Sequence, residues 1–372
     1  MRIMHVAETA KGGIASYLSE LVPAQTAEFG AHNICVLIPD RDLGEVTFDG
    51  DCNVQTFGCK RRSWGALLNL YGKFSALLRE FNPDIVHLHS SFAGFVGRMR
   101  IFVLYRRPVI VYCPHGWSFG RESSLFGKLV YSYVERVLAL RTDHIINISR
   151  FEQNLAETYG LPRKKMEVIY HGIADRPSEA RRAWPGDDRK VRILFVGRLD
   201  HQKGFDVALR LIDELPHQFH LYVAGANVLR HRTRGWAEMA GRVHHLGWLS
   251  RHDLNRYYKA ADYVLMPSRW EGFGLVAIEA MKNGVPVISS DRGALPEINV
   301  DGETGYVFDI DNLASVVARL VATDEASRRR LGEQARRRYL RTFTADRMNS
   351  ASLKLYNELV SGGHGCQATG PL

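Results

Sequence analysis

Short runs of apolar residues alternate with stretches of helical periodicity along most of the chain. In the first half, the runs that predict strands are residues 2–7, 33–38, 84–88, 108–113, 143–148 and 166–170. In the second half, the corresponding runs are residues 191–196, 219–224, 262–266, 285–289 and 305–308. Continuous apolar strands that alternate with helices are typical of parallel sheets buried on both faces. We therefore expect an α/β protein with two doubly wound, Rossmann-like domains.

The segment between the two series of strands contains prolines and several charged residues. It spans residues 175–190 and predicts a linker between an N-terminal domain, 1–174, and a C-terminal domain, 191–345. Residues 346–360 have helical spacing, and we expect this last helix to pack back on the N-terminal domain. Residues 361–372 predict a flexible tail.

Composition narrows the class of protein without choosing its partner. A chain of 372 residues with 45% hydrophobic content has enough apolar material for two cores. Its five cysteines are scattered and form no C-x-x-C pair, which argues against a disulfide framework or a zinc site and suits a reducing cytosol. No apolar run approaches the roughly 20 residues of a membrane span, and the N-terminus lacks a signal-peptide pattern. The net charge of +9 suits nucleic acid, a phosphorylated substrate or an anionic membrane surface.

Candidate chemistry in the first half lies where predicted strands end. Gly12 and Gly13 follow the first strand, where paired glycines let the backbone approach an anion but also suit an ordinary tight turn. His115 follows residues 108–113, at a position that suits a ligand contact as well as a structural role. His87 and His89 alternate along one strand like a metal-binding pair. The sequence shows no third ligand at a sensible spacing, so a packed strand is the favoured interpretation.

Candidate chemistry in the second half is richer in charge. Arg198 and Lys203 occupy the loop after residues 191–196, where a guanidinium fork and an ammonium group suit a diphosphate. Glu271 lies in a loop opened by glycines, and Glu279 lies inside the helix that begins near Leu275. The two carboxylates are therefore on different elements, so a common helix face does not relate them, whereas a shared ligand could.

These residues together resemble a known family. The segment Glu271-Gly-Phe-Gly-Leu-Val-Ala-Ile-Glu279 resembles the E-x7-E motif of retaining glycosyltransferases of the GT-B fold, the large group called family 4. The loop from Gly197 to Gly204 is similar to the diphosphate-binding loop of that family, and Gly12-Gly13 matches its N-terminal glycine loop. A later segment of the family matches Leu295-Pro296-Glu297-Ile298 with Gly302 and Gly305. The matches span most of the chain in the right order.

The resemblance implies a role for each matched residue. Arg198 and Lys203 would bind the diphosphate of a nucleotide-sugar, such as a UDP-sugar, and Glu279 would accept hydrogen bonds from the ribose. Glu271 would hold the transferred sugar, and His115 would lie near the sugar and the reaction centre. The remaining donor-binding residues would be Gly12, Gly13, Phe273, Gly274 and Leu275. The family reaction is a metal-independent, front-face retaining transfer across a cleft between the domains, so no metal and no cofactor is expected.

The acceptor is less visible, and the nucleobase pocket departs from the family pattern at Ala224-Gly225-Ala226-Asn227. Basic residues such as Arg98, Arg100 and Arg107 border the apolar stretch 92–105. They suit an anionic membrane and a polyprenyl-diphosphate-linked saccharide acceptor, or they simply cover solvated helices. We expect a cytoplasmic enzyme of exopolysaccharide or lipopolysaccharide assembly, peripheral on the inner face of the plasma membrane.

Two alternatives remain open from the sequence. A nucleotide-sugar epimerase uses the same fold, although the cationic loop and the E-x7-E segment favour transfer. A basic, non-catalytic scaffold is the other alternative. We expect no nucleic-acid partner, because no such binding motif is present and the basic residues are dispersed.

Overall fold

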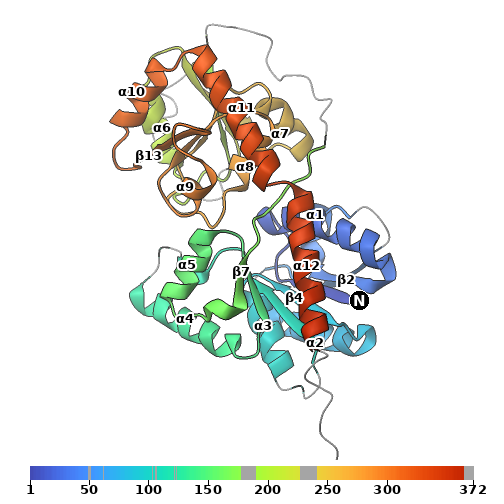
Figure 1. Cartoon of the computed structure of the whole chain (residues 1–372). Helices are drawn as coiled ribbons and strands as arrows, with labels where there is room; N and C mark the ends of the chain where they lie inside the picture. Colours follow the sequence, from blue (N-terminus) through green and yellow to red (C-terminus); the bar gives the residue numbers. More distant parts are fainter. Residues whose placement is uncertain are drawn as a thin grey trace, which may run out of the picture. The chain divides into compact units, whose positions relative to one another are not determined.

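The computed structural model describes residues 1–48, 52–61, 63–102, 104, 107–120, 122, 124–176, 190–226 and 241–363 (Figure 1). The chain forms two compact units, Met1–Ala174 with Thr344–Leu372, and Asp175–Phe343. We call them the N-terminal unit and the C-terminal unit. Residues 177–189 of the expected linker and 364–372 of the expected tail lie outside the described residues. Within the described part of the chain, no helix is long and apolar enough to cross a membrane.

The N-terminal unit is built on a seven-stranded parallel sheet with the order β3-β2-β1-β4-β5-β6-β7. Its strands are β1 (Ile3–Ala7), β2 (Ile34–Pro39), β3 (Asn53–Phe57), β4 (Ile85–His89), β5 (Val109–Cys113), β6 (His144–Asn147) and β7 (Met166–Val168). Its helices are α1 (Gly13–Phe29), α2 (Trp64–Phe81), α3 (Ser91–Phe102), α4 (Leu125–Ala139), α5 (Arg150–Thr158) and α12 (Ala345–Gly363). Short 3-10 turns are η1 (Ala31–Asn33), η2 (Asp40–Glu45), η3 (Ser118–Gly120) and η4 (Arg163–Lys165). The chain order reverses direction between β1 and β4, which makes this pair the switch point of the sheet.

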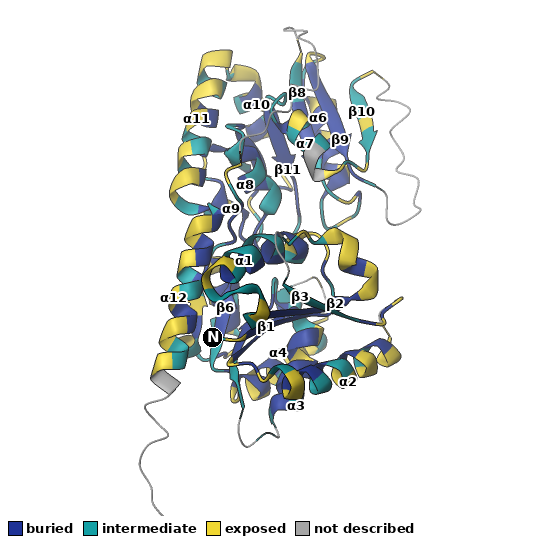
Figure 2. Cartoon of the chain, turned by 90° about the vertical axis from the view of Figure 1, so that its right-hand side faces the viewer, coloured by how far each residue is buried: buried dark blue, intermediate teal, exposed yellow. Residues whose placement is uncertain are grey.

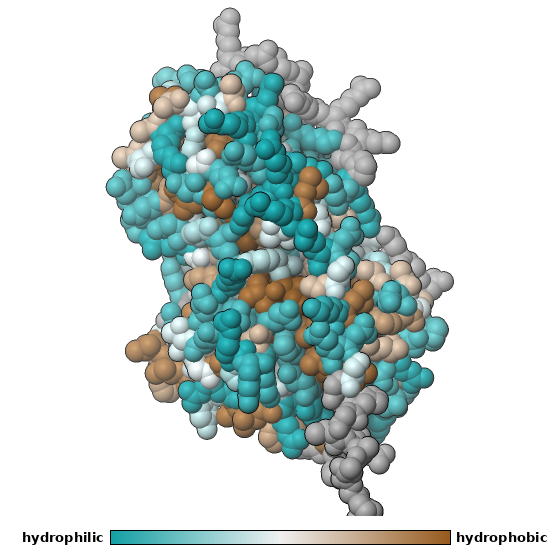
Figure 3. Space-filling model, in the orientation of Figure 1, coloured by the Kyte–Doolittle hydropathy of each residue, from teal (hydrophilic) through white to brown (hydrophobic). Residues whose placement is uncertain are grey.

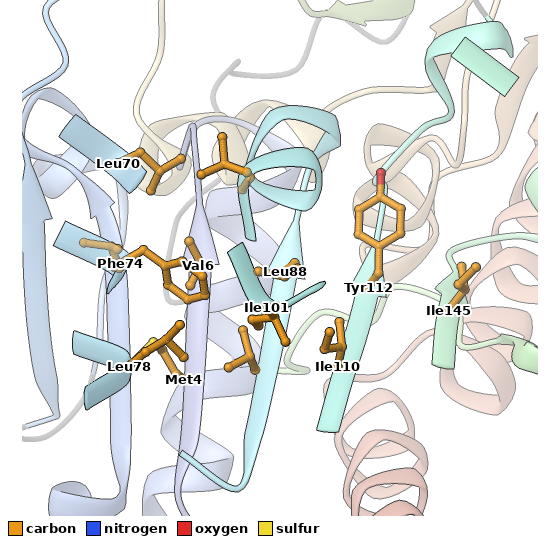
Figure 4. Packing of buried hydrophobic residues seen from close by; sticks show 14 of the residues in the cluster. Met4, Val6, Leu70, Phe74, Leu78, Leu88, Ile101, Ile110, Tyr112 and Ile145 are labelled. Carbon is orange, nitrogen blue, oxygen red and sulfur yellow. The ribbon is translucent and has the colours of Figure 1, made fainter. Parts of the chain in front are cut away.

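Helices cover both faces of this sheet. On one face, Leu70, Phe74 and Leu78 of α2 pack against Met4 and Val6 of β1 (Figure 4). Leu70, Phe74 and Leu78 follow at intervals of four residues, the spacing that places side chains on one side of a helix. On the other face, α1 and α12 pack against each other. All five residues of β1 and all five of β4 are buried, as expected for strands covered on both faces (Figure 2).

The last helix belongs to the N-terminal unit because the chain returns to it at Thr344. Ile173 and Thr344 form an isolated parallel bridge, and the amide of Ala345 donates to the carbonyl of Ile173 over 2.9 Å. Further along α12, Asn349 Nδ2 donates to the carbonyl of Glu20 in α1 over 3.2 Å. The helix begins at Ala345 and extends to Gly363, three residues beyond its expected end.

The C-terminal unit repeats the design with a six-stranded parallel sheet of order β10-β9-β8-β11-β12-β13. Its strands are β8 (Val191–Val196), β9 (Phe219–Ala224), β10 (Val243–Gly247), β11 (Tyr263–Met266), β12 (Val287–Ser290) and β13 (Gly305–Phe308). Its helices are α6 (Phe205–Glu214), α7 (Arg251–Tyr258), α8 (Leu275–Lys282), α9 (Leu295–Ile298), α10 (Ala314–Ala322) and α11 (Glu325–Thr342). Its switch point lies between β8 and β11. The expected fold class of two doubly wound α/β domains is confirmed.

The sequence pattern missed two strands, and both lie at the edge of a sheet. β3 borders only β2, and β10 borders only β9. Four of the five residues of β3 and all five of β10 are at least partly exposed. These two edge strands therefore lack the continuous apolar run that marks a strand covered on both faces.

We predict that Gly172→Ala destabilises the N-terminal unit at the point where α12 joins it. An added Cβ would lie 2.2 Å from the carbonyl oxygen of Thr344, so the backbone must move apart. Such overpacking costs about 1–3 kcal/mol, measured as a lower urea midpoint.

Gly72→Ala is the matched control in the same unit. An added Cβ at Gly72 meets no atom within 4 Å, and the residue lies inside α2. This variant should gain about 0.5–1 kcal/mol. Equal stability of the two variants would show that α12 is not held by this close contact.

Candidate functional site

The sequence-predicted residues of the C-terminal unit meet at the switch point of its sheet. β8 and β11 are neighbouring parallel strands, so the loops that follow them leave the same edge. The first loop carries Arg198 and Lys203, and the second carries Glu271. Ligands of open α/β sheets bind at this edge, where strand order reverses.

An ion pair joins the two loops. Lys203 Nζ contacts Glu271 Oε1, and the hydroxyl of Ser268 donates to the same carboxylate oxygen over 3.0 Å. The amide of Lys203 also donates to Asp200 Oδ1 over 3.0 Å, which fixes the first loop. Both members of the pair are largely buried, with side chains 22% and 11% exposed. The charges are therefore held in place by the protein before any ligand arrives.

Arg198 extends from the same loop and is more exposed. Its guanidinium donates to Gln202 Oε1 over 2.7 Å and lies 3.0 Å from Asp200 Oδ2. With 47% of its side chain exposed, the guanidinium keeps access to solvent and to an incoming anion. One cation is thus paired inside the site and another stands at its margin.

Glycines allow the loops at this edge to approach closely. Gly204 has φ of +67°, and a Cβ there would lie 1.9 Å from the carbonyl oxygen of Pro267. Gly293, in the loop after β12, has φ of +64°, and a Cβ there would lie 2.3 Å from the carbonyl oxygen of Glu271. Both positions combine a left-handed backbone with direct backbone contact, so larger residues are excluded for two independent reasons.

Glu279 lies one step further along the same segment, on α8. The helix begins at Leu275 after Gly274, whose φ of +103° turns the chain from the loop into the helix. Tyr258 Oη donates to Glu279 Oε2 over 2.7 Å. Burial and the Glu279 carboxylate raise the pKa of Tyr258 well above its usual value, so this hydroxyl stays protonated as a donor. Phe273 is buried against Phe343, which anchors the loop between the two glutamates.

In the N-terminal unit, the expected residues lie at the carboxyl edge of its own sheet. Gly12 has φ of +55° and precedes α1, and an added Cβ there would meet no atom within 4 Å. The glycine is therefore required by its backbone angle and leaves open space beside the helix start. Gly13 is the first residue of α1, and its carbonyl lies 3.3 Å from His171 Nε2.

His115 follows β5 and is held by a histidine on the neighbouring strand. Its Nε2 lies 3.0 Å from His89 Nδ1, and its ring packs edge-on to Tyr17. Its backbone has φ of +53°, an uncommon value for a residue with a side chain. Burial and the neighbouring His171 lower the pKa of His115 to about 3, so the imidazole is neutral at physiological pH.

The structure supplies the third histidine that the sequence did not show. His5 on β1 is the register partner of His87 on β4, and the fully buried rings of His5, His87 and His89 face one another. One nitrogen from each lies within 4.8 Å of the others, a spacing compatible with a metal ion. The expectation of an unaccompanied pair is wrong, because parallel pairing brings together positions 82 residues apart. In the structure, however, His5 and His89 hydrogen-bond each other directly over 3.0 Å.

The structure thus brings Arg198, Lys203 and Glu271 together, with Glu279 on the adjoining helix. Sequence reasoning missed the groups that hold them, Ser268 and Tyr258. Ser268 shared a segment with Glu271, but a serine in a loop carries no specific signal, and Tyr258 lies on another helix. In the segment 224–227, which departs from the family pattern, a glycine is needed at Gly225 for packing, because a Cβ there would lie 1.8 Å from the carbonyl oxygen of Gly197. Asn227 lies outside the described residues.

The buried histidines predict a loss of stability in mild acid. Burial lowers the pKa of His5 to about 4 and that of His115 to about 3, whereas an unfolded histidine titrates near 6.5. Below pH 6.5 the unfolded chain therefore takes up protons that the folded chain refuses. The free energy of unfolding should fall between pH 6.5 and 5 by up to about 1.4 kcal/mol per pH unit and histidine. Urea unfolding at several pH values measures this slope.

A shallower slope in His115→Asn would attribute part of the effect to this residue. A pH-independent free energy of unfolding between pH 7 and 5 would contradict the neutral state of the cluster.

Comparison with known proteins assigns the chain to a family. Residues 11–176 match the model of Glycosyltransferase Family 4, and residues 178–338 match that of Glycosyl transferases group 1. An uncharacterized 41.2 kDa protein in the cps region of Klebsiella pneumoniae is 34% identical over 85% of this chain and 88% of its own length. The Escherichia coli UDP-Gal:alpha-D-GlcNAc-diphosphoundecaprenol alpha-1,3-galactosyltransferase is 29% identical over 92% of both chains.

A solved structure supports the fold. Sucrose-phosphate synthase from Thermosynechococcus elongatus superimposes with a TM-score of 0.85 at 21% identity, covering 97% of this chain and all of that one. The two sheets, the loops at the switch point and these matches agree with the GT-B fold implied by the resemblance. The chain belongs to the group 1, or family 4, glycosyltransferases.

Proposed function

We propose that this glycosyltransferase transfers a sugar from a nucleoside-diphosphate sugar with retention and without a metal ion. The acceptor is a saccharide or a polyprenyl-diphosphate-linked saccharide in exopolysaccharide or lipopolysaccharide assembly. The observation that carries the proposal is the meeting of Arg198, Lys203 and Glu271 at the switch point of the C-terminal sheet.

The cations suit the departing diphosphate. Lys203 lies at the switch point, and Arg198 stands exposed at its margin. Charge develops on the leaving group as the bond to the sugar breaks, and fixed cations stabilise that charge without a metal. We propose that a donor phosphate competes with Glu271 for Lys203, which leaves the Glu271 carboxylate to accept hydrogen bonds from sugar hydroxyls. The N-terminal amides of α8, after Gly274 and Leu275, add further donors.

The remaining residues are proposed to bind the other groups of the donor. Glu279 binds the ribose hydroxyls, oriented by the hydrogen bond from Tyr258. Gly12, Gly13 and His115 of the N-terminal unit serve the phosphates and the transferred sugar. Because the leaving phosphate itself takes the acceptor proton in a front-face transfer, no protein nucleophile is needed.

Arg198→Ala and Glu279→Ala test the donor site. Each variant should lower transfer by about 10²–10³-fold, because a fixed donor or acceptor to the reacting nucleotide-sugar is lost. Arg329→Ala and Glu333→Ala are matched controls on α11, where both side chains are more than half exposed. They should leave the rate unchanged. Normal transfer by both Arg198→Ala and Glu279→Ala would place the donor elsewhere.

Further measurements test the donor, the stereochemistry and the metal independence separately. A panel of nucleotide-sugars, tested by thermal shift, should identify the donor that raises the melting temperature. NMR of the product should show the anomeric configuration of the donor, and transfer should continue in excess chelator. An inverted product would exclude the retaining mechanism, and release of an epimerised free nucleotide-sugar without acceptor would favour the epimerase alternative.

A pocket at the edge of the N-terminal sheet suits a lipid-linked acceptor. Its volume is about 340 Å³. It is lined by Glu8, Phe57, Cys59, Ser63, Trp64, Ala66, Leu67, Leu70 and Phe92. Glu8 is the acidic member of the lining, at the end of β1, and it accepts a hydrogen bond from Ser90 over 2.9 Å. An apolar wall beside one carboxylate matches a saccharide carried on a lipid. The E. coli relative is named for such an acceptor, a GlcNAc-diphosphoundecaprenol.

The surface next to this pocket exposes many large apolar side chains. Trp64 and Phe92 of the pocket are 83% and 39% exposed, on α2 and α3. α4 continues the exposed surface and turns Ser132 and Glu135 inward. Its outward side chains include Leu125, Phe126, Leu129, Val130, Tyr131, Tyr133 and Val137. Apolar side chains gather over the region of α4 at the lower left of Figure 3. We call the exposed apolar residues of α2, α3 and α4 the apolar face.

Basic residues accompany this apolar face, although not all of those expected from the sequence. Arg98 does not belong to the surface. It is fully buried, donates to Glu135 Oε2 over 2.8 Å and lies over the ring of Tyr112. Arg136 and Arg141 are exposed at the C-terminal end of α4. Apolar side chains mixed with cations suit an anionic lipid surface. We propose that this face lies on the inner leaflet of the plasma membrane, where a polyprenyl-linked acceptor is embedded.

We predict that the protein cosediments with phosphatidylglycerol vesicles and much less with phosphatidylcholine vesicles. The double variant Phe126→Ser/Leu129→Ser should bind at least about tenfold more weakly, because two exposed apolar side chains no longer enter the lipid. Added salt should weaken binding of the unaltered protein by screening the arginines.

Trp248→Ser is the control for this experiment. Trp248 is 72% exposed on the C-terminal unit, so it tests whether any exposed aromatic side chain gives the same effect. Equal binding of the double variant and the unaltered protein would contradict a role for α4.

A further inference from the structure

A buried line of hydrogen bonds runs from α1 to His115. Gln25 Oε1 lies 2.6 Å from His5 Nε2, and His5 Nδ1 lies 3.0 Å from His89 Nε2. His89 Nδ1 in turn lies 3.0 Å from His115 Nε2. We call Gln25, His5, His89 and His115 the histidine chain. Gln25, His5 and His89 have no exposed surface, and only His115 is partly accessible.

Each imidazole of this chain carries one proton. Burial lowers the pKa of His5 and His115 to about 4 and 3, and that of His89 well below its usual value. A neutral imidazole has one N–H donor and one acceptor nitrogen. A contact between two imidazole nitrogens therefore needs a proton on one side and a lone pair on the other. The direction of one hydrogen bond consequently decides the direction of the next.

Gln25 supplies the starting direction. Its carbonyl oxygen only accepts, so His5 must carry its proton on Nε2 and leave Nδ1 bare. His89 must then donate from Nε2 and accept at Nδ1, and His115 must donate from Nε2. The free nitrogen of His115, Nδ1, is left as an acceptor.

A tyrosine from the last helix favours this orientation of the amide. Tyr356 Oη lies 2.6 Å from His87 Nδ1 and 3.5 Å from Gln25 Nε2. When the hydroxyl donates to His87, its lone pair faces the amide NH₂ group of Gln25. The amide then presents its oxygen to His5, as the structure has it.

We propose that Gln25 is a positioning residue that fixes the protonated nitrogen of His115 through His5 and His89. The chain keeps Nδ1 of His115 as a hydrogen-bond acceptor for a hydroxyl group of the substrate. The effect on transfer rests on the proposed function of His115, whereas the tautomer itself does not. Gln25 lies two imidazoles away from His115 and acts only through them.

Nitrogen-15 NMR of histidine-labelled protein tests the tautomer directly. The signals of His115 are identified by their loss in His115→Asn. In the unaltered protein, Nε2 of His115 should show the shift of a protonated nitrogen and Nδ1 that of a bare nitrogen. A proton on Nδ1 of His115 would overturn the proposal, and the tautomer itself is read in the unaltered protein.

Gln25→Met tests the cause. Methionine has a similar volume but offers no amide, so His115 should populate both tautomers. The kcat of transfer should fall about tenfold, the order expected for loss of one oriented hydrogen bond, with little change in the donor KM. Tyr356→Phe tests the tyrosine, because it keeps the Gln25 amide but removes the hydroxyl that favours its orientation. It should weaken the preferred tautomer of His115 less than Gln25→Met does.

The outcomes separate this proposal from competing explanations. An unchanged tautomer in Gln25→Met would overturn the role of Gln25. A shifted tautomer with unchanged kcat would retain the chain but remove His115 from the proposed reaction. Metal analysis provides a further test. The proposal would also be overturned if each purified chain held one Zn²⁺ ion and its removal by a chelator changed the NMR shifts of His5 and His89. In that case, His5 Nδ1 and His89 Nε2 would be ligands instead of hydrogen-bond partners.

Discussion

The close approach of the loops after β8 and β11 is the constraint on which the candidate site depends. Neighbouring parallel strands deliver these loops to one edge, and close backbone contact between Gly204 and Pro267 lets Lys203 reach Glu271. A Cβ at Gly204 would lie 1.9 Å from the carbonyl oxygen of Pro267, so a side chain there would force these two loops apart. The positions of the charged groups therefore depend on the packing of the backbone as well as on the charged residues themselves.

The N-terminal unit buries a cluster of polar side chains against its sheet, whereas the sheet of the C-terminal unit is covered mainly by apolar side chains. Four histidines, a glutamine and a tyrosine meet between the sheet and the two helices α1 and α12. Neutral imidazoles make this affordable, because each can donate on one side and accept on the other without carrying charge into the core. Such a network is directional, so a residue far from the surface determines which atom the exposed end presents.

The N-terminal unit also buries a charged pair while it exposes apolar side chains. Arg98 and Glu135 are buried as a pair, while α4 turns leucine, phenylalanine and tyrosine side chains outward. Desolvating an ion pair and exposing apolar side chains both cost free energy, so neither arrangement is explained by stability alone. The membrane surface proposed above would cover these apolar side chains and so account for their exposure. The adjacent apolar pocket reaches Glu8, which follows the carboxyl end of β1.

The sequence by itself determined the fold class, the buried strands and the segments that carry Arg198, Lys203, Glu271 and Glu279. These features are local, because apolar runs, glycine turns and motif spacing are written in consecutive residues. Tertiary structure decided what depends on neighbours in space: the edge strands β3 and β10, the burial of Arg98 and the meeting of His5 with His87 and His89. Parallel pairing joins positions separated by a whole crossover, so the spacing of histidines along the chain cannot reveal that they share one face of a sheet.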